Sequence, residues 1–295
     1  MTSVFFTCYG ERGGTVGPWN RNGLKFYGQS RMFELYNANC LVKMKDISSN
    51  SIDLVICDLP FGCLTNKNHV DGSPGESKGG KMYTASTGCS WDIPIDLEVF
   101  WKEIKRIRKN DHTPCIHFCT TKYGFELWES NKKEFRYDLV WDKGRGISFL
   151  SANKMPMRSH EMLYVFSKTG AYYNRVDISG DFPSWVGSHS FSQVYNLPKP
   201  EKEGYKKGKG EGKRCVLSVV SNIKTTKKGG HPTEKPIELY KWLIERYCPI
   251  GGTVLDPTFG SCNSGIAARE LGRNYIGIEM NKEFYDKAKK TILGE

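Results

Sequence analysis

The sequence lacks the features that mark membrane, secreted and repetitive proteins. No apolar run approaches the roughly eighteen residues that a membrane-spanning helix needs. The opening residues MTSVFFTCYGERGG lack the order of basic, apolar and small residues found in a signal peptide, and no internal repeat is evident. With 38% hydrophobic and 25% charged residues in a chain of 295, these absences predict an intracellular globular protein that buries a sizeable core.

Signatures of metal sites and disulfides are also missing. The ten cysteines are scattered, and no two have the C-x-x-C spacing of a zinc site. We therefore expect reduced thiols, as in cytosolic proteins, and no bound metal. Cys115 and His117 lie in one apolar run and are interpreted as core residues, while His160 has no second histidine to form a zinc site with it.

The segment 254–280, VLDPTFGSCNSGIAARELGRNYIGIEM, has neither a G-x-G-x-x-G fingerprint nor the Lys-Ser or Lys-Thr of a phosphate loop. Its order is instead strand, acid, glycine-containing loop, helix and a second strand ending in Glu279. Glycine lets a ligand approach the backbone, and the distal acid can accept hydrogen bonds from ribose hydroxyls. The expected ligand is therefore a nucleoside without phosphates, such as S-adenosylmethionine.

Acidic residues are scarce in one part of this basic chain. The net charge is +11, and the segment 199–228 holds ten Lys or Arg against three Glu. Clustered positive charge suits a polyanion because neutralised phosphates release counterions, although a solvated basic loop has the same composition. Charge alone leaves both interpretations open.

Strand-like and helix-like segments alternate, which predicts an α/β fold with a mostly parallel sheet and helices on both faces. A Gly- and Ser-rich segment, 62–90, is expected to be a mobile lid or a disordered loop, and periodicity also fades from 172 to about 230. The expected strands are 52–57, 115–119, 137–141, 161–166, 253–256 and 275–279, and the expected helices are 97–107, 236–247, 265–271 and one from 283.

The first expected strand ends in Asp58-Leu59-Pro60-Phe61. Ligands of open parallel sheets bind at the carboxyl ends of the strands, so an acid at this place is a candidate site residue. A plain turn is the alternative, because Asp and Pro commonly end strands.

Several motifs resemble those of amino-directed DNA methyltransferases of the β class, a circularly permuted group. Asp58-Leu59-Pro60-Phe61 looks like their Asp-Pro-Pro-Tyr motif, DPTFGS from Asp256 looks like their cofactor loop, and HPTEKP from His231 resembles the element that precedes this loop. Segments 91–92, 141–143 and 158–161 also resemble recurring family segments, and the likeness covers about 33–168 and 231–292. The resemblance implies a Rossmann-like, S-adenosylmethionine-dependent methyltransferase fold with a basic insertion region. It also implies an enzyme that flips adenine out of duplex DNA and methylates its exocyclic N6 amine by direct transfer.

The same resemblance implies roles for individual residues. The Asp58 carboxylate and the Leu59 carbonyl would accept hydrogen bonds from the two amine N–H groups, Pro60 would fix the turn, and Phe61 would stack on the base. Asp rather than Ser at position 58 favours adenine over cytosine. Leu59, Cys262 and Asn263 depart from the family pattern, and Cys262 is expected to crowd the cofactor loop. The implied cofactor residues are Glu279 at the ribose, Asp256, Pro257, Phe259, Gly260 and Ser261 at the methionine end, and Thr233 and Lys235 at the carboxylate.

We expect a catalytic domain made of residues 1–168 and 231–295 and a target-recognition region at 169–230. The expected partner is duplex DNA; a homodimer and a cognate restriction endonuclease are left open. The expected location is the cytoplasm of a bacterium, or of a host cell if a phage or virus encodes the protein. Three alternatives stay open: methylation of the cytosine exocyclic amine, a catalytically silent nucleic-acid-binding protein and, less favoured, a methyltransferase of RNA or small molecules.

Overall fold

The computed structural model describes residues 32–61, 93–147, 149, 152–179, 213–225 and 234–293. The chain divides into two units, one formed by 1–174 with 218–295 and a small one formed by Arg175–Leu217. The described part of the small unit contains the antiparallel pair β6 (Ile178–Ser179) and β7 (Lys213–Arg214). No helix among the described residues is both long enough and apolar enough to cross a membrane.

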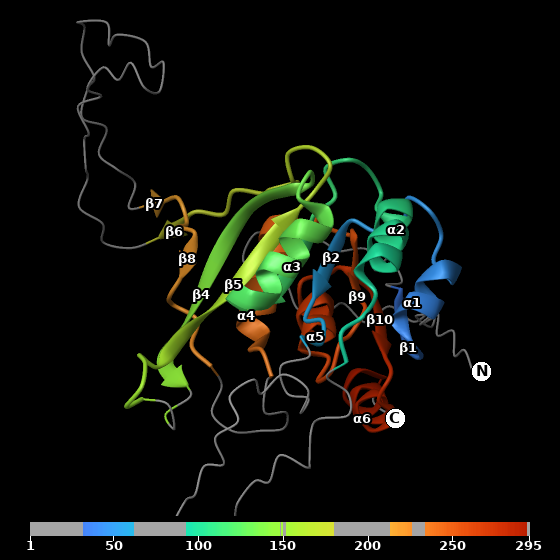
Figure 1. Cartoon of the computed structure of the whole chain (residues 1–295). Coiled ribbons are helices and arrows are strands. Elements are labelled where there is room, and N and C mark those ends of the chain that lie inside the picture. The colour runs from blue at the N-terminus through green and yellow to red at the C-terminus, as the bar shows by residue number, and fades with distance from the viewer. Residues whose placement is uncertain are drawn as a thin grey trace, which may run out of the picture. The chain divides into compact units, whose positions relative to one another are not determined.

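The larger unit is built on an eight-stranded sheet in the order β1-β10-β9-β2-β3-β5-β4-β8 (Figure 1). Strands β1, β10, β9, β2 and β3 run parallel, β5 runs antiparallel to β3 and β4, and β8 pairs parallel with β4. The strands are β1 (Phe33–Asn37), β2 (Leu54–Cys57), β3 (Cys115–Cys119), β4 (Phe135–Ile147), β5 (Arg158–Phe166), β8 (Val219–Val220), β9 (Thr253–Asp256) and β10 (Asn274–Glu279).

Helices cover both faces of this sheet (Figure 1). One face carries α1 (Cys40–Lys43), the short 3-10 helix η1 (Met44–Asp46), α2 (Leu97–Ile107) and α3 (Thr121–Asn131), and the other carries α4 (Ile237–Tyr247), α5 (Asn263–Glu270) and α6 (Lys282–Leu293). The predicted mostly parallel sheet with helices on both faces is therefore confirmed.

The central strands read as unbroken apolar runs because helices bury both of their faces. Every residue of β2, β3 and β9 is buried. Helix α2 begins where the sequence predicts, since Asp96 accepts hydrogen bonds from the backbone N–H groups of Glu98 and Val99 at 2.9 and 3.1 Å. Burial and capping together account for the agreement at these elements.

Helix α3 was not predicted from the sequence. Its periodicity is weak and it contains Gly124, a poor helix former. The structure supplies the reason, because a Cβ at Gly124 would lie 2.9 Å from the Tyr164 ring of β5. Glycine therefore lets α3 pack closely on the sheet, and the Thr120 hydroxyl caps the helix by accepting from the Tyr123 N–H at 3.3 Å.

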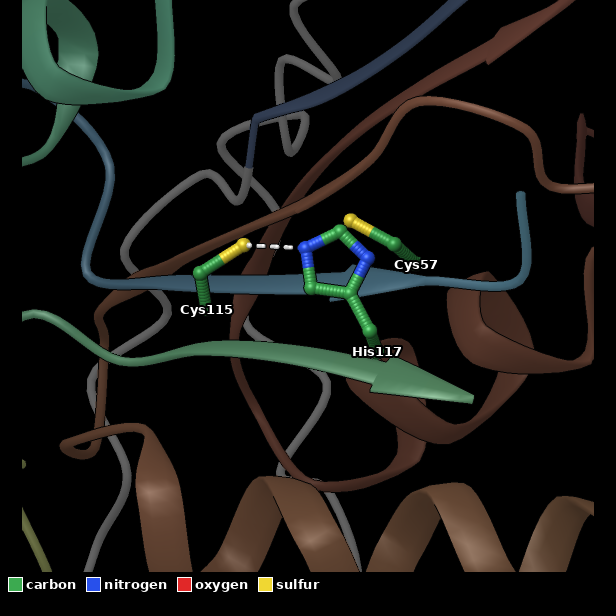
Figure 2. A group of neighbouring side chains, drawn as sticks. All are labelled: Cys57, Cys115 and His117. Carbon is green, nitrogen blue, oxygen red and sulfur yellow. Dashed lines mark hydrogen bonds between the residues drawn. The ribbon is translucent and has the colours of Figure 1, made fainter. Parts of the chain in front are cut away.

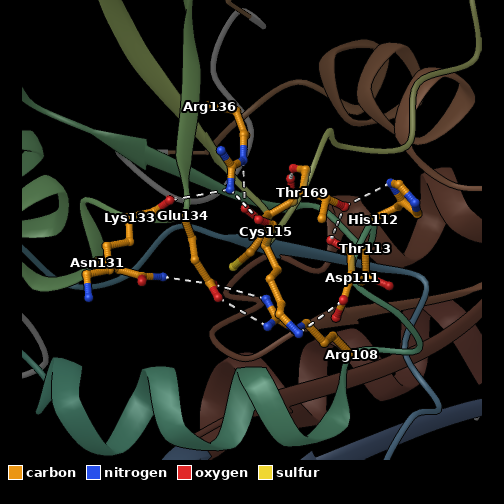
Figure 3. Close-up of polar contacts among 12 residues, drawn as sticks. Arg108, Asp111, His112, Thr113, Cys115, Asn131, Lys133, Glu134, Arg136 and Thr169 are labelled. Atoms are coloured by element: carbon orange, nitrogen blue, oxygen red, sulfur yellow. Dashed lines mark hydrogen bonds and ion pairs between the residues drawn. The ribbon is translucent and has the colours of Figure 1, made fainter.

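The antiparallel part of the sheet is tied to α2 by an ion pair shown in Figure 3. Both terminal nitrogens of the Arg108 guanidinium donate to the Glu134 carboxylate, at 3.0 and 3.1 Å, and Asn131 donates to the same carboxylate. Burial opposes ionisation of Glu134, but these hydrogen bonds outweigh it and hold its pKa below the ordinary value. The Gly- and Ser-rich segment 62–90 and most of the basic segment 199–228 lie outside the described residues.

Candidate active site

The predicted site residues follow three neighbouring parallel strands. Asp58 comes directly after β2, the loop DPTFGS begins at the end of β9, and Glu279 ends β10. From β9 the chain leads to β10 on one side, whereas β2 leads to β3 on the other, so the strand order reverses between β9 and β2. Such a switch point is where open α/β sheets bind ligands. The fold thus brings the two halves of the motif set to one edge.

Asp58 is held at both its backbone and its carboxylate. The Thr258 hydroxyl donates to the Asp58 carbonyl oxygen at 3.1 Å, and Lys235 Nζ lies 2.6 Å from Asp58 Oδ2. The Asp58 side chain is 25% exposed. Burial raises the pKa of this carboxyl, and the nearby Lys235 ammonium opposes the rise.

The three residues after Asp58 differ in burial. Leu59 is only 2% exposed and packs in the core, which explains how an apolar residue is accepted where the family motif has Pro. Pro60 and Phe61 are half-buried. The Phe61 ring lies 5.0 Å, centroid to centroid, from Tyr123 of α3, so α3 supports one side of this aromatic residue.

Asp256 is buried in the loop that it begins. Its Oδ1 accepts from the Thr258 N–H at 3.1 Å, and its Oδ2 accepts from the Ser264 hydroxyl at 2.6 Å. Burial raises its pKa to about 7. Both carboxylate oxygens therefore accept hydrogen bonds that order the loop. Nothing in the sequence indicated the contact with Ser264. Pro257 is buried and Ser261 half-buried in the same loop.

Gly260 and Glu279 meet across the loop. The Gly260 N–H donates to Glu279 Oε2 at 2.9 Å, and the Asn281 N–H donates to Oε1 at 2.7 Å. Burial raises the pKa of Glu279. Gly260 has a φ of +53°, and a Cβ added there would meet nothing within 4 Å. Phe259 is buried beneath the loop, with its N–H bonded to the Ile278 carbonyl. Open space beside a glycine backbone, next to a carboxylate, fits a nucleoside cofactor.

Cys262 adopts a left-handed conformation, with φ 62° and ψ 26°, at the start of α5. Its side chain is fully buried, and Sγ lies 3.7 Å from the Tyr275 hydroxyl. The thiol thus points into the core, whereas the open space lies beside Gly260. Its effect on cofactor affinity stays a prediction.

Lys235 contacts more than one acid. Its Nζ lies 3.2 Å from Glu161 Oε1, and Glu161 Oε2 lies 2.7 Å from Lys143 Nζ. Asn263 fixes this stretch of backbone by donating to the Lys235 carbonyl at 2.8 Å. The sequence marked the segments of Lys143 and Glu161 only as family-like and did not indicate that they meet Lys235. Thr233 lies outside the described residues.

A second group of reactive side chains, Cys57, Cys115 and His117, lies in the core (Figure 2). Cys115 Sγ is 3.3 Å from His117 Nε2. Burial opposes ionisation of Cys115, but Cys57 and His117 outweigh it and lower the thiol pKa to about 6. The imidazole packs among aromatic rings, including Phe100 of α2 at 5.4 Å between centroids. Neighbouring residues of a strand point to opposite faces, so this group and Lys235, which contacts Phe118, lie on opposite faces of the sheet.

Comparison with known proteins defines the class. A family model described as DNA methylase, covering N6 and N4 enzymes, matches residues 52–290, so the chain belongs to the N6/N4 DNA methylase family. The predicted amino-directed DNA methyltransferase and its cofactor S-adenosylmethionine are confirmed at this level. The family covers N6 and N4 methylation alike, so membership alone does not choose between adenine and cytosine.

Individual relatives agree with this class, and solved structures share the fold. The type II methyltransferase M2.MboI of Moraxella bovis is 25% identical over 274 residues, which is 90% of this chain and 89% of the relative. M.SmaI of Serratia marcescens is 30% identical over 159 residues, 54% of this chain and 46% of the relative. The structure of M1.HpyAVI in complex with S-adenosylmethionine has a TM-score of 0.53 at 20% identity, covering 88% of this chain and 98% of that one. PvuII DNA methyltransferase, described as cytosine-N4-specific, has a TM-score of 0.56 at 15% identity, covering 86% and 84%. These structures share the fold.

Proposed function

We propose that this protein is a site-specific DNA methyltransferase that methylates the exocyclic N6 amine of adenine in duplex DNA. The observation that carries the proposal is the place of Asp58. Its carboxylate lies at the end of β2, its backbone carbonyl is bonded to the cofactor-side loop through Thr258, and the loop itself is bonded to Glu279. A hydrogen-bond acceptor for the base and a nucleoside-binding loop thus share one sheet edge.

The chemistry explains why an acceptor is needed. The amine of adenine is a weak nucleophile because its lone pair is delocalised into the ring. When the Asp58 carboxylate and the Leu59 carbonyl accept hydrogen bonds from the two N–H groups, the nitrogen is drawn toward tetrahedral geometry and its lone pair is directed at the methyl group. An ionised Asp58 is the stronger acceptor, and Lys235 favours that form against the effect of burial. Positioning and fixed charges then supply the catalysis.

On the cofactor side, S-adenosylmethionine supplies an electrophilic methyl group. We assign Glu279 to the ribose hydroxyls, because a carboxylate has about four acceptor positions and backbone N–H groups do not use all of them. Gly260 leaves room for the approach of the cofactor. Asp256, with both oxygens engaged, shapes the loop that faces the methionine end, and Pro257, Phe259 and Ser261 complete that loop. Thr233 stays a prediction at the carboxylate end.

Other parts of the chain are proposed to bind the target base and the DNA. We assign Phe61 to stacking on the flipped base, with Tyr123 behind it. Residues 169–230, with their surplus of basic side chains, are the proposed target-recognition region, in which contacts to base edges would specify the sequence. Three further points stay predictions: a homodimer, a restriction endonuclease partner and a bacterial cytoplasmic location. The relatives' names as type II methyltransferases favour the endonuclease partner.

The test is methyl transfer from labelled S-adenosylmethionine to unmodified duplex DNA, with the product nucleoside identified by mass spectrometry. We expect N6-methyladenine from the wild type and a loss of at least ~100-fold in kcat for Asp58→Ala, with cofactor affinity by calorimetry unchanged. Asp46→Ala, at an acid whose side chain is 69% exposed, is the matched control and retains activity. N4-methylcytosine as the product would establish the cytosine alternative. Cofactor binding without transfer to any DNA would contradict the proposal and favour RNA or a silent binding protein.

A further inference from the structure

Four charged side chains from four segments meet at the candidate acceptor. Lys143 comes from β4, Glu161 from β5, Lys235 from the segment before α4, and Asp58 follows β2. The contacts form a chain: Lys143 Nζ to Glu161 Oε2 at 2.7 Å, Glu161 Oε1 to Lys235 Nζ at 3.2 Å, and Lys235 Nζ to Asp58 Oδ2 at 2.6 Å. These ion pairs therefore run without a break from the antiparallel part of the sheet to the candidate acceptor.

Three of these four side chains are largely removed from solvent, and the four charges balance. The side chains of Lys143, Glu161 and Lys235 are 15%, 8% and 6% exposed. Two ammonium groups face two carboxylates, so each of these four charges contacts one of opposite sign. Deleting one member of a buried pair is costly because the other stays buried and uncompensated. If these ion pairs only balanced buried charge, their role would be purely structural. The experiment must separate that role from a functional one.

Resting on the proposed function, we propose that Lys143, Glu161 and Lys235 are positioning residues that fix the Asp58 carboxylate, with Oδ2 bound to Lys235 and Oδ1 directed to the target amine. Lysine has a long, flexible side chain. Glu161 anchors the Lys235 ammonium from a second side, and the Phe118 ring lies 5.1 Å from it. Thr258 holds the Asp58 backbone, so the acceptor is fixed at both ends.

This geometry gives Lys235 a different role from the one that the resemblance implied. A cofactor carboxylate would compete for an ammonium group that already contacts two carboxylates, at 2.6 and 3.2 Å. The two roles predict different kinetics. A cofactor ligand acts on KM for S-adenosylmethionine, whereas a residue that positions the acceptor acts on kcat.

The experiment uses the full chain and three variants: Lys235→Met, Glu161→Gln, and the double variant that removes one charge of each sign. For Lys235→Met we expect kcat to fall about 100-fold, the cost of misplacing a reacting group, with KM for S-adenosylmethionine within threefold. Glu161→Gln lowers kcat less, because Lys235 keeps Asp58. The double variant restores the net charge of the site, although Lys143 and Asp58 each lose their ion-pair partner. It therefore stays slow if Lys235 positions Asp58 and recovers if only the net charge matters. Lys241→Met, at a lysine of α4 that is 26% exposed, is the matched control.

Two results overturn the inference: recovery of kcat in the double variant, or a rise in KM for S-adenosylmethionine with kcat retained. A wild type that transfers no methyl group to DNA would contradict the proposed function instead. In that case, NMR titration of the Asp58 carboxyl carbon still tests the ion pair between Lys235 and Asp58. The charged neighbours of this carboxyl include Lys235, Glu161 and Lys143. We expect it to titrate at higher pH in Lys235→Met than in the wild type, and equal titration would overturn the pairing.

Discussion

Asp256→Asn tests the ionisation of the buried loop carboxylate. Asparagine keeps the shape of the side chain: its Oδ1 can accept from the Thr258 N–H, and its amide can donate to the Ser264 oxygen. The Ser264 proton is then free for the Tyr275 hydroxyl, 2.8 Å away. The substitution thus removes the charge of Asp256 and leaves its two contacts in place.

The effect depends on pH in a defined direction. Burial raises the pKa of Asp256 from 3.8 to about 7 in the folded protein. Below the lower value the carboxyl is protonated in both states, so the shift does not affect stability. As the pH rises toward 7, the unfolded chain releases the proton while the folded protein retains it, and the free energy of unfolding falls. At about 1.4 kcal/mol per pKa unit, the penalty reaches about 4 kcal/mol above pH 7.

The assay is urea denaturation of the wild type and Asp256→Asn at pH 5 and pH 8. We expect the stability advantage of the variant to grow by roughly 3 kcal/mol between these two pH values, because the folded wild type ionises Asp256 only near pH 7. The control, Asp46→Asn, removes an exposed acid of a surface ion pair and should change stability by less than about 1 kcal/mol at either pH. An equal difference between Asp256→Asn and wild type at both pH values would refute the reasoning.

Three further substitutions test separate parts of the structure. Glu134→Gln leaves Arg108, which is 11% exposed, without its carboxylate, so urea denaturation should show a loss of about 2–4 kcal/mol while kcat stays unchanged. Gly260→Ala adds a Cβ at a φ of +53° and in the space that we assign to the cofactor, so calorimetry should show at least ~10-fold weaker binding of S-adenosylmethionine; unchanged affinity would place the cofactor elsewhere. Cys262→Gly relieves the strain of a left-handed backbone at φ 62° but leaves a cavity where the sulfur packs beside Tyr275. Because these two effects oppose each other, stability should change by no more than about 1 kcal/mol. Tighter cofactor binding by Cys262→Gly would show that the thiol does crowd the loop.

The central strands and most helices could be predicted because local sequence patterns, such as apolar runs, helical spacing and capping residues, determine them. Strand β3 and helix α2 occur at the predicted residues, the first as a short apolar run and the second through helical spacing and an Asp cap. Strand β4 continues to Ile147, six residues past the predicted end, because it pairs with β5 rather than because its own residues alternate. Helix α3 depends on the close approach of Gly124 to Tyr164, a tertiary contact with no local signal.

The candidate site was predictable in its motifs and not in its contacts. Asp58, Asp256 and Glu279 follow strands, and the order of parallel strands brings such positions together. The partner of Asp58 could not be found this way, because Lys235 lies 177 residues away in the sequence. The resemblance there assigns Lys235 to the cofactor carboxylate and not to Asp58.

The site also explains why the order of motifs along the chain does not matter for the geometry. The Thr258 hydroxyl and the Asp58 carbonyl are 200 residues apart in sequence and 3.1 Å apart in space. They meet because β2 and β9 pair directly, with Val55 opposite Leu255. Parallel strands align their carboxyl ends whichever is made first, so an acceptor after one strand and a cofactor loop after its neighbour need only that pairing. The pairing does not fix the rotation of the Asp58 side chain, and Lys235, which contacts its carboxylate, comes from outside both strands. The sheet therefore places the proposed acceptor, and in our proposal the buried ion pairs of Lys235, Glu161 and Lys143 orient it.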